Sequence, residues 1–127
     1  MDIREYSANS LSYIGDAVFT LRVRQFFIDN GYQSARTLQH LCNGYNSASG
    51  QRRVFERLEA ENFFSEEELE IYKRGRNHIS HIPKSSDRLS YEIATGLEAL
   101  CGYLYLSDTK RLDEFFSEVF KGGIENE

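Results

Sequence analysis

Apolar residues recur at steps of three and four along most of this 127-residue chain, which is the spacing of one face of an α-helix. The sequence shows no sustained alternation of period two and no Asn-Gly hairpin between β-branched runs. The pattern therefore predicts an all-α fold of about six helices. Their predicted ranges are 9–29, 34 to about 43, about 47 through at least 58, 65–76, 88–106 and 109–120.

Local signals support the ends of two of these helices. Asn30 and Gly31 close the first one as a left-handed C-terminal cap does. Ser65 lies three residues before Glu68, so the two residues predict a capping box at the start of the fourth. The stretch 77–87 is the one extended loop that the pattern predicts, and it separates the first four helices from the last two.

The bulk composition predicts a single domain over residues 1–127 with a sizeable core, since 40% of residues are hydrophobic and 13% aromatic. The longest nearly apolar stretch, 96–106, is too short for a membrane span, and the N-terminus lacks the apolar segment of a signal peptide. Cys42 and Cys101 lie in apolar helical patterns, which favours buried free thiols. We therefore expect a soluble, cytoplasmic protein with no membrane partner.

Two acids stand out because their neighbours are apolar. Asp16 lies in LSYIGDAVF and Glu98 in ATGLEALCGYLYL. A carboxylate in such surroundings is costly to bury unless it is paired or binds a metal ion. For an isolated acid the more common arrangement is a pair with an arginine at the edge of the core, and Arg22 and Arg88 are the candidates.

Glycines beside these acids favour a different arrangement from an ion pair with an arginine. Gly15 precedes Asp16, and Gly96 and Gly102 flank Glu98. Glycine inside a helix costs about 1 kcal/mol relative to alanine, so its presence needs a reason. The reason we expect is a close approach, either between the two helices or of a ligand to the backbone.

Smaller oxygen-bearing side chains share the faces of the two acids. Asn9 and Ser12 lie on the face of Asp16, and Thr95 lies on the face of Glu98. Such a set of hard oxygens suits Mg²⁺, which takes one or two carboxylates and keeps several waters. Zinc does not suit the sequence, because its three histidines show no paired spacing with cysteine.

Several motifs resemble those of the ribonuclease III family. IGDAV at 14–18 and LEALCGYLYL at 97–106 resemble the two metal-binding motifs of its catalytic domain. KRGRN at 73–77 and IPKSSD at 82–87 resemble the Mini-ribonuclease III branch. The resemblance covers roughly residues 7–121, and no double-stranded-RNA-binding domain follows, which also points to that branch.

The resemblance implies the chemistry of the site. Asp16 and Glu98 match the family's metal-binding acids, whereas Asn9, Ser12 and Thr95 stand where typical members carry further acids. It implies Mg²⁺ as cofactor, with Mn²⁺ as a substitute, and hydrolysis of double-stranded RNA to 5′-phosphate and 3′-hydroxyl ends. It also implies a homodimer that matures the large-subunit (23S) ribosomal RNA precursor. A ribosomal protein is a candidate further partner, which the sequence does not settle.

A basic segment precedes the second acid. Between residues 73 and 88 there are five lysines and arginines and one acid, so this stretch is predicted to contact RNA phosphates. The alternative is a solvated basic loop paired with nearby glutamates. The predicted RNA-contacting residues are Lys73, Arg74, Arg76, Asn77, Lys84 and Arg88.

Other polar and aromatic groups are interpreted as structural. The six acids of 59–70 are predicted to face solvent. The cluster Gln51, Arg52, Arg53 and Arg57 is interleaved with acids and is interpreted as a surface face. Four aromatic residues are interpreted as core or dimer contacts rather than base-stacking platforms: Tyr13, Phe19, Phe26 and Tyr103.

Two other functions remain open at this point. The first is a catalytically inactive ribonuclease III-like module that only binds RNA or the ribosome. The second is an all-α dimerisation domain with no role in RNA metabolism. The presence of Asp16 and Glu98 favours the enzyme, and the missing acids at Asn9, Ser12 and Thr95 favour the binding module. The net charge of −5 excludes a simple nucleic-acid coat but not a local basic face.

Overall fold

The structure is a computed structural model of the chain, and it describes residues 1–78 and 87–121. That part holds six α-helices, one short 3₁₀ helix and no strand, which confirms the all-α prediction. Lys84 and most of the predicted loop lie outside the described residues. The elements are η1 (Ile3–Glu5), α1 (Ala8–Asp29), α2 (Ala35–Asn46), α3 (Ala48–Ala60), α4 (Glu66–Asn77), α5 (Arg88–Ser107) and α6 (Thr109–Val119).

The helix ends follow the capping chemistry of the sequence, with one correction. The capping box at Ser65 is present, and Gly31 has a φ of +100°, as a left-handed cap requires. The predicted end of the second helix near residue 43 is wrong, because α2 continues to Asn46. Ser47 alone separates α2 from α3, and its side chain caps the start of α3. The short η1 was not predicted.

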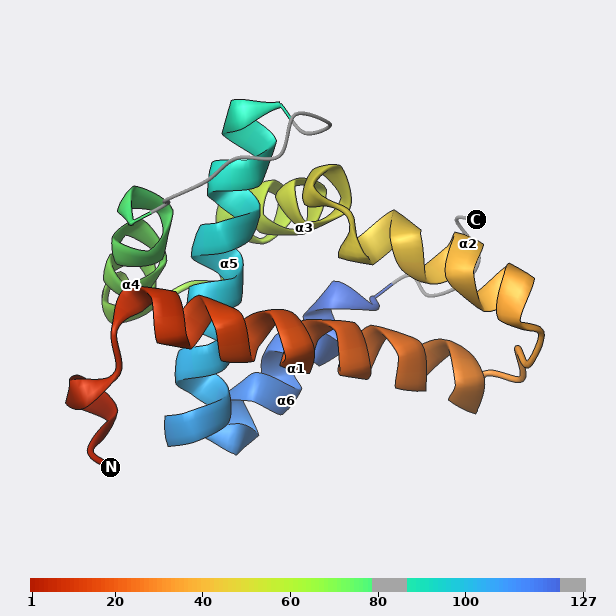
Figure 1. Ribbon diagram of the computed structural model, residues 1–127, viewed down its shortest axis with the longest axis horizontal. Coiled ribbons are helices and arrows are strands. Elements are labelled where there is room, and N and C mark those ends of the chain that lie inside the picture. The colour runs from red at the N-terminus through yellow and green to blue at the C-terminus, as the bar shows by residue number, and fades with distance from the viewer. Residues whose placement is uncertain (79–86, 122–127) are drawn as a thin grey trace.

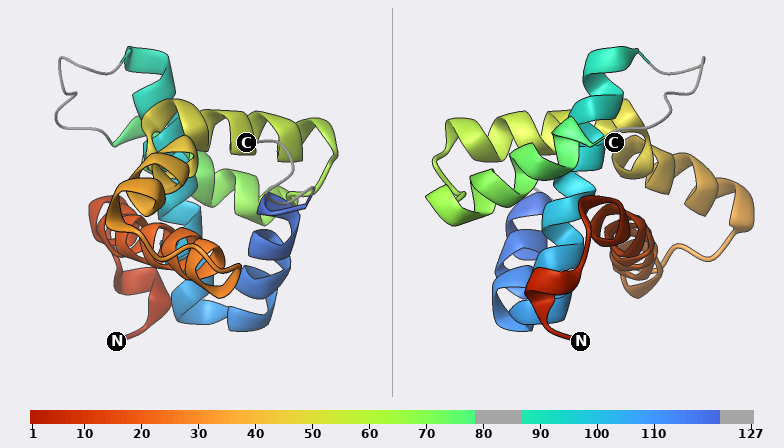
Figure 2. Two further views of the ribbon diagram at one scale, coloured as in Figure 1. Left: turned by 90° about the vertical axis from the view of Figure 1, so that its right-hand side faces the viewer. Right: turned by 60° about the vertical axis from the view of Figure 1, so that its left-hand side comes forward.

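Helix α5 is the centre of the fold (Figures 1 and 2). It packs against α1, α3, α4 and α6, so it must be apolar on several sides at once. No helix of the described residues is both long and apolar enough to cross a membrane. The buried apolar side chains of α5 are Ile93, Ala94, Leu97, Ala99, Leu100, Cys101 and Leu104.

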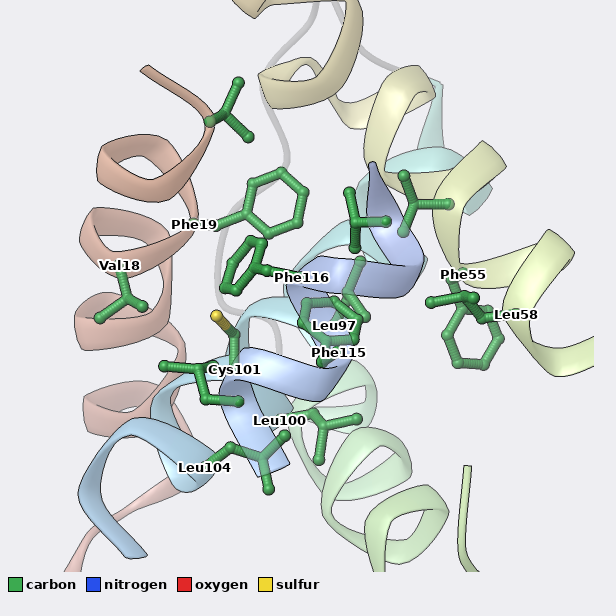
Figure 3. Close-up of a cluster of buried hydrophobic side chains, with 14 of the residues drawn as sticks. Val18, Phe19, Phe55, Leu58, Leu97, Leu100, Cys101, Leu104, Phe115 and Phe116 are labelled. Carbon is green, nitrogen blue, oxygen red and sulfur yellow. The ribbon is translucent and has the colours of Figure 1, made fainter. Parts of the chain in front are cut away.

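Aromatic side chains join the other helices to this centre (Figure 3). Phe19 of α1 lies against Phe116 of α6, with ring centroids 5.6 Å apart. On the other side, Phe55 of α3 stacks on Tyr72 of α4 at 4.0 Å. Leu97 of α5 is fully buried within the same cluster. Each such side chain contributes about 1.5–3 kcal/mol by leaving water, so this core fixes how the helices cross.

Glycines allow two helix crossings that no larger residue would permit. A Cβ at Gly15 would collide with the carbonyl oxygen of Glu98, and one at Gly102 would collide with the backbone of α1. The predicted close approach of the two helices is therefore confirmed. Gly96 serves a different crossing, because a Cβ there would lie 2.7 Å from the ring of Tyr72 in α4.

The prediction that the acidic segment 59–70 faces solvent is wrong for Glu68. This side chain is buried, and Arg111 of α6 donates to it from Nε at 2.7 Å. Burial alone would raise the pKa of Glu68, but Arg111 and Ser65 overcome that effect and hold the pKa below its usual value. The pair ties α6 to the start of α4.

Leu21 and Leu89 recur at helical spacing with apolar neighbours, which predicts that they face the core, but both face outward. Leu21 of α1 is 62% exposed and Leu89 of α5 is 49% exposed. On α1, a different face meets the core, so Leu21 lies on the opposite side of that helix. The buried residues of α1 are Ala8, Leu11, Gly15, Val18, Phe19, Val23 and Phe27.

Candidate active site

The crossing of α1 and α5 brings Asp16 and Glu98 together. Glu98 is half-buried and lies within hydrogen-bonding reach of Asp16, which is exposed to solvent. The backbone contact that sets their spacing is made at Gly15, directly before Asp16, and at the carbonyl of Glu98 itself. The two carboxylates are thus neighbours because the main chains of their helices touch.

A third polar group joins them from α3. The side chain of Gln51 is only 1% exposed, and its Nε2 donates to Oε2 of Glu98 at 3.2 Å. The same nitrogen lies 3.4 Å from the backbone carbonyl of Asn46, at the end of α2. Three helices therefore converge on the Glu98 carboxylate.

The interpretation of the cluster that begins at Gln51 as a surface face is wrong for this residue. Arg52, Arg53 and Arg57 keep exposed or half-exposed side chains, but Gln51 points inward. The sequence carried a signal for this, because Gln51 lies three residues before Val54 and seven before Leu58, on the helix stripe that reaches the core.

The pair of carboxylates is electrostatically unfavourable by itself. Burial, together with the negative charge of Asp16, raises the pKa of Glu98 to about 8. The hydrogen bond from Gln51 acts in the opposite direction but is too weak to offset the rise. A cation beside both carboxylates would remove this repulsion.

The arginines proposed as partners of these acids have other partners. Arg22 donates to Asp113 of α6 at 2.8 Å. Arg88 forms an ion pair with Glu92, one turn further along α5, also at 2.8 Å. Neither Asp16 nor Glu98 therefore forms the ion pair with Arg22 or Arg88 that the sequence offered as the alternative.

The smaller oxygen-bearing residues satisfy their own helices first. Ser12 Oγ donates to the carbonyl of Asn9 at 3.1 Å, and Thr95 Oγ1 donates to that of Tyr91 at 2.9 Å. Each hydroxyl oxygen keeps lone pairs that can accept from a water. Asn9, Ser12 and Thr95 lie on the helices of the two acids, and a role for them beside a cation stays a prediction.

The donor set fits Mg²⁺ in its chemistry. The described residues contain no group of three or more His, Cys, Asp and Glu that could enclose a metal ion. Two neighbouring carboxylates suit an ion that binds one or two of them and keeps several waters. Their mutual repulsion, evident in the raised pKa of Glu98, is what such an ion would relieve.

Five of the six predicted RNA-contacting residues lie at the end of α4 and the start of α5, and the sixth, Lys84, lies outside the described residues. Lys73 and Asn77 are exposed, and Arg74 is exposed while donating to the carbonyl of Tyr6 at 3.1 Å. The guanidinium of Arg76 lies 5.7 Å from the centre of the Tyr72 ring. Arg88, the exposed first residue of α5, is held by its ion pair with Glu92.

Helix α4 brings this basic end close to the carboxylates. A Cβ at Gly75 would collide with the side chain of Ala99 and lie 3.4 Å from the carbonyl of Thr95. The segment of α5 that carries Glu98 is therefore in direct contact with the last turns of α4.

The profile of the Ribonuclease III domain matches residues 9–109. This chain belongs to the ribonuclease III family. It is 34% identical to the Mini-ribonuclease 3 of Enterococcus faecalis over 94% of this chain and 92% of that protein. It is 38% identical to the Mini-ribonuclease 3 of Kosmotoga olearia over 91% of this chain and 78% of that protein.

Structural similarity agrees with this assignment. A crystal structure of a protein from Fusobacterium nucleatum superposes with a TM-score of 0.82 and 32% identity, over 95% of this chain and 97% of that one. The resemblance to the Mini-ribonuclease III branch is confirmed, and with it the all-α fold. The chain is an endoribonuclease of a family that acts on double-stranded RNA.

The raised pKa of Glu98 predicts that Glu98→Gln stabilises the metal-free protein at pH 8. The amide removes one of two like charges and still accepts a hydrogen bond from Gln51. The folded carboxyl titrates near 8 against 4.5 for a free one, so wild-type stability falls as pH rises from about 5 to 8. One pKa unit is about 1.4 kcal/mol, so we expect a gain of at least about 1 kcal/mol at pH 8.

Urea unfolding in the presence of EDTA at pH 5 and pH 8 measures this effect. At pH 5 the wild-type carboxyl is protonated in the folded state, so the variant and the wild type should be nearly equal. Glu70→Gln changes the same charge at an exposed site of α4 and should show no such divergence. A difference between Glu98→Gln and wild type that is independent of pH would contradict the prediction.

Proposed function

We propose that this chain is a Mg²⁺-dependent endoribonuclease that hydrolyses double-stranded RNA and leaves 5′-phosphate and 3′-hydroxyl ends. Its residues 1–127 act as a single catalytic domain. The observation that carries the proposal is the meeting of Asp16 and Glu98 at the α1–α5 crossing, in a chain of the ribonuclease III family. Mn²⁺ can substitute for Mg²⁺, since both accept oxygen ligands.

Asp16 and Glu98 act in this reaction by holding the metal ion. A bound Mg²⁺ supplies an activated water and stabilises the charge that develops on the phosphate. Asp16 and Glu98 provide the hard oxygens that hold the ion. Because the main chains of α1 and α5 touch beside both residues, the spacing of these oxygens does not depend on flexible loops.

The decisive test is Asp16→Asn. Loss of one ligand charge should remove several kcal/mol of transition-state stabilisation, so cleavage should fall by at least about a hundredfold. Single-turnover cleavage of a structured large-subunit ribosomal RNA precursor, with Mg²⁺ or with EDTA, followed by mapping of the ends, measures it. Asp29→Asn makes the same change at the exposed end of α1 and should cut normally.

Two outcomes would overturn the assignment. Undiminished cleavage by Asp16→Asn excludes Asp16 as a ligand of the catalytic ion. A wild-type chain that binds the duplex but leaves it intact with Mg²⁺ or Mn²⁺ supports the alternative, a catalytically inactive module that binds RNA or the ribosome. The absence of acids at Asn9, Ser12 and Thr95 is the feature that keeps this alternative open.

We further propose that the substrate is the precursor of large-subunit (23S) ribosomal RNA in the cytoplasm, with a ribosomal protein as an assisting partner. The similarity to Mini-ribonuclease 3 proteins supports this substrate class. The state of the cysteines is compatible with the proposed cytoplasmic location. Both are buried free thiols, and burial raises their pKa, so neither is reactive. The end mapping described above also tests this substrate.

The last two turns of α4, the first residue of α5 and Lys84, which lies outside the described residues, form the proposed RNA face. A-form RNA is recognised through phosphates and 2′-hydroxyls rather than base edges, so a basic surface beside the acidic pair is the expected complement. The proposed contacts are Lys73, Arg74, Arg76, Asn77, Lys84 and Arg88.

Lys73→Ala should weaken duplex binding and reduce the slope of log affinity against log salt by about one for each phosphate contact that is lost. Filter binding at several salt concentrations, without divalent metal, gives this slope. Lys110→Ala removes the same charge from the exposed start of α6, and its slope should equal that of the wild type. Equal slopes for Lys73→Ala and wild type would exclude Lys73 from the RNA face.

We propose that the chain is a homodimer that pairs through α1. Its outward face carries exposed Tyr13, Leu21 and Ile28, which are 83%, 62% and 52% exposed and lie seven and eight residues apart. Beside this face, a groove of about 410 Å³ between α1 and α2 has Ile28 and Leu38 in its lining. A two-fold contact would let the apolar face of each copy meet that of the other.

Tyr13→Asp should convert the dimer to a monomer, because it places a charge within this apolar contact. Sedimentation equilibrium at micromolar concentration should give twice the 14.7 kDa chain mass for the wild type and the single mass for the variant. Tyr105→Asp makes the same change at an exposed aromatic residue of α5 and should remain a dimer. A monomeric wild type would refute the interface.

A further inference from the structure

We propose that Gln51 is a positioning residue of the carboxylate pair: its side-chain amide orients Glu98 toward Asp16, and the affinity of the site for a divalent cation depends on this hydrogen bond. The inference rests on the proposed metal site and deepens it. Gln51 itself need not touch the cation or the RNA.

The geometry gives the Gln51 amide two fixed contacts. Its Nε2 lies 3.2 Å from Oε2 of Glu98 and 3.4 Å from the backbone carbonyl of Asn46. A carboxamide nitrogen has two protons, so it can serve both acceptors at once. With Oε2 held in this way, the Glu98 carboxylate cannot rotate freely, and Oε1 is left for another partner.

A rigid junction of two helices holds Gln51 in place. A Cβ at Gly50 would collide with the carbonyl oxygen of Gly44, so α2 and α3 touch directly beside Gln51. Arg53 donates to the same carbonyl of Gly44 at 2.9 Å. Only Ser47 separates the two helices, which leaves little freedom between them. A side chain on such a junction can fix the rotamer of a neighbour.

Burial of the Gln51 amide costs folding free energy, so a contribution to stability does not explain why this position is a glutamine. Oε1 of Gln51 has no hydrogen-bond donor among the described residues, and neither does Oδ1 of Asn46. A buried acceptor without a donor costs about 1–3 kcal/mol. An apolar side chain of similar length would avoid that cost on the same core-facing stripe. The polar identity of position 51 is therefore explained by what it does for Glu98.

The glutamine side chain is uncharged, and this property matters for cation binding. An arginine or lysine at this position would also donate to Glu98, but it would cancel the charge that attracts a cation. An acid would add repulsion and could not donate. Glutamine orients the carboxylate and leaves its charge available. Outer hydrogen-bond partners of metal ligands are typically worth about 10–100-fold in metal affinity or activity.

Gln51→Met is the direct test, because methionine has a similar length and no hydrogen-bond donor. Titration of the metal-free protein with Mn²⁺, followed by electron paramagnetic resonance in the absence of RNA, should show a Kd at least about tenfold higher than that of the wild type. Gln33→Met makes the same change at an exposed position and should leave the Kd unchanged. The urea midpoint of Gln51→Met should equal or exceed that of the wild type.

Kinetics separate positioning from a structural role. In Gln51→Met, kcat should fall at low Mg²⁺ and recover partly at high Mg²⁺, while KM for RNA stays constant, because the defect lies in cation binding. A variant with wild-type Mn²⁺ affinity and wild-type Mg²⁺ dependence would overturn the inference. So would a loss that coincides with a lower urea midpoint and does not respond to added metal.

A measurement on the unmodified protein covers the case in which Gln51→Met does not fold. The side-chain amide resonances of Gln51 should shift when Mg²⁺ is added, because the carboxylate to which they donate gains a cation. Unchanged Gln51 resonances at saturating Mg²⁺ would overturn the inference. A wild type that binds Mn²⁺ but cuts no duplex would overturn the proposed function alone, so the two failures are distinguishable.

Discussion

The backbones of α1 and α5 touch where the helices cross, and the placement of the chemical groups follows from that contact. The carbonyl oxygen of Glu98 occupies the space that a side chain at Gly15 would need, and Gly102 gives the same clearance to α1. Because the touching atoms belong to the main chain, neither helix can rotate or slide without a collision. Asp16 follows Gly15 directly, so the fold sets how far apart the main chains of the two acids lie, and the hydrogen bond from Gln51 sets where the Glu98 carboxylate points.

A buried glutamate, Glu68, and a half-buried one, Glu98, show opposite pKa shifts, and the contrast separates a structural role from a functional one. Glu68 accepts two charged hydrogen bonds from Arg111, so its pKa is lowered and it ties α4 to α6. Burial and the like charge of Asp16 raise the pKa of Glu98 to about 8, and its neutral amide donor, Gln51, offsets only part of that rise. The first arrangement stabilises the folded chain. The second destabilises it, and a perturbed carboxyl of this kind is a common property of functional sites.

The sequence predicted the parts of this site that depend on local pattern. Asp16 and Glu98 could be recognised by their apolar neighbours. Gly15 and Gly102 predicted the close crossing of their helices, because a glycine inside a helix is explained by close contact. Gln51 was missed, since the bond that matters joins α3 to α5 across 47 positions and depends on the angle between them. Glu68 was missed for the same reason, because its partner Arg111 is 43 positions away.

Helix α4 shows how a chain with a net charge of −5 can still carry a local basic surface. Its first turn carries Glu66 and Glu67 and its last turn Arg74 and Arg76, an order that the helix dipole favours in any protein. That order alone would give a solvated helix with no function. What makes it relevant is Gly75, which lets this basic end lie directly against the segment of α5 that holds Glu98. The packing of α4 on α5 thus puts the basic end of α4 on the same segment of α5 as Glu98, so a chain that is acidic overall carries a local basic surface there.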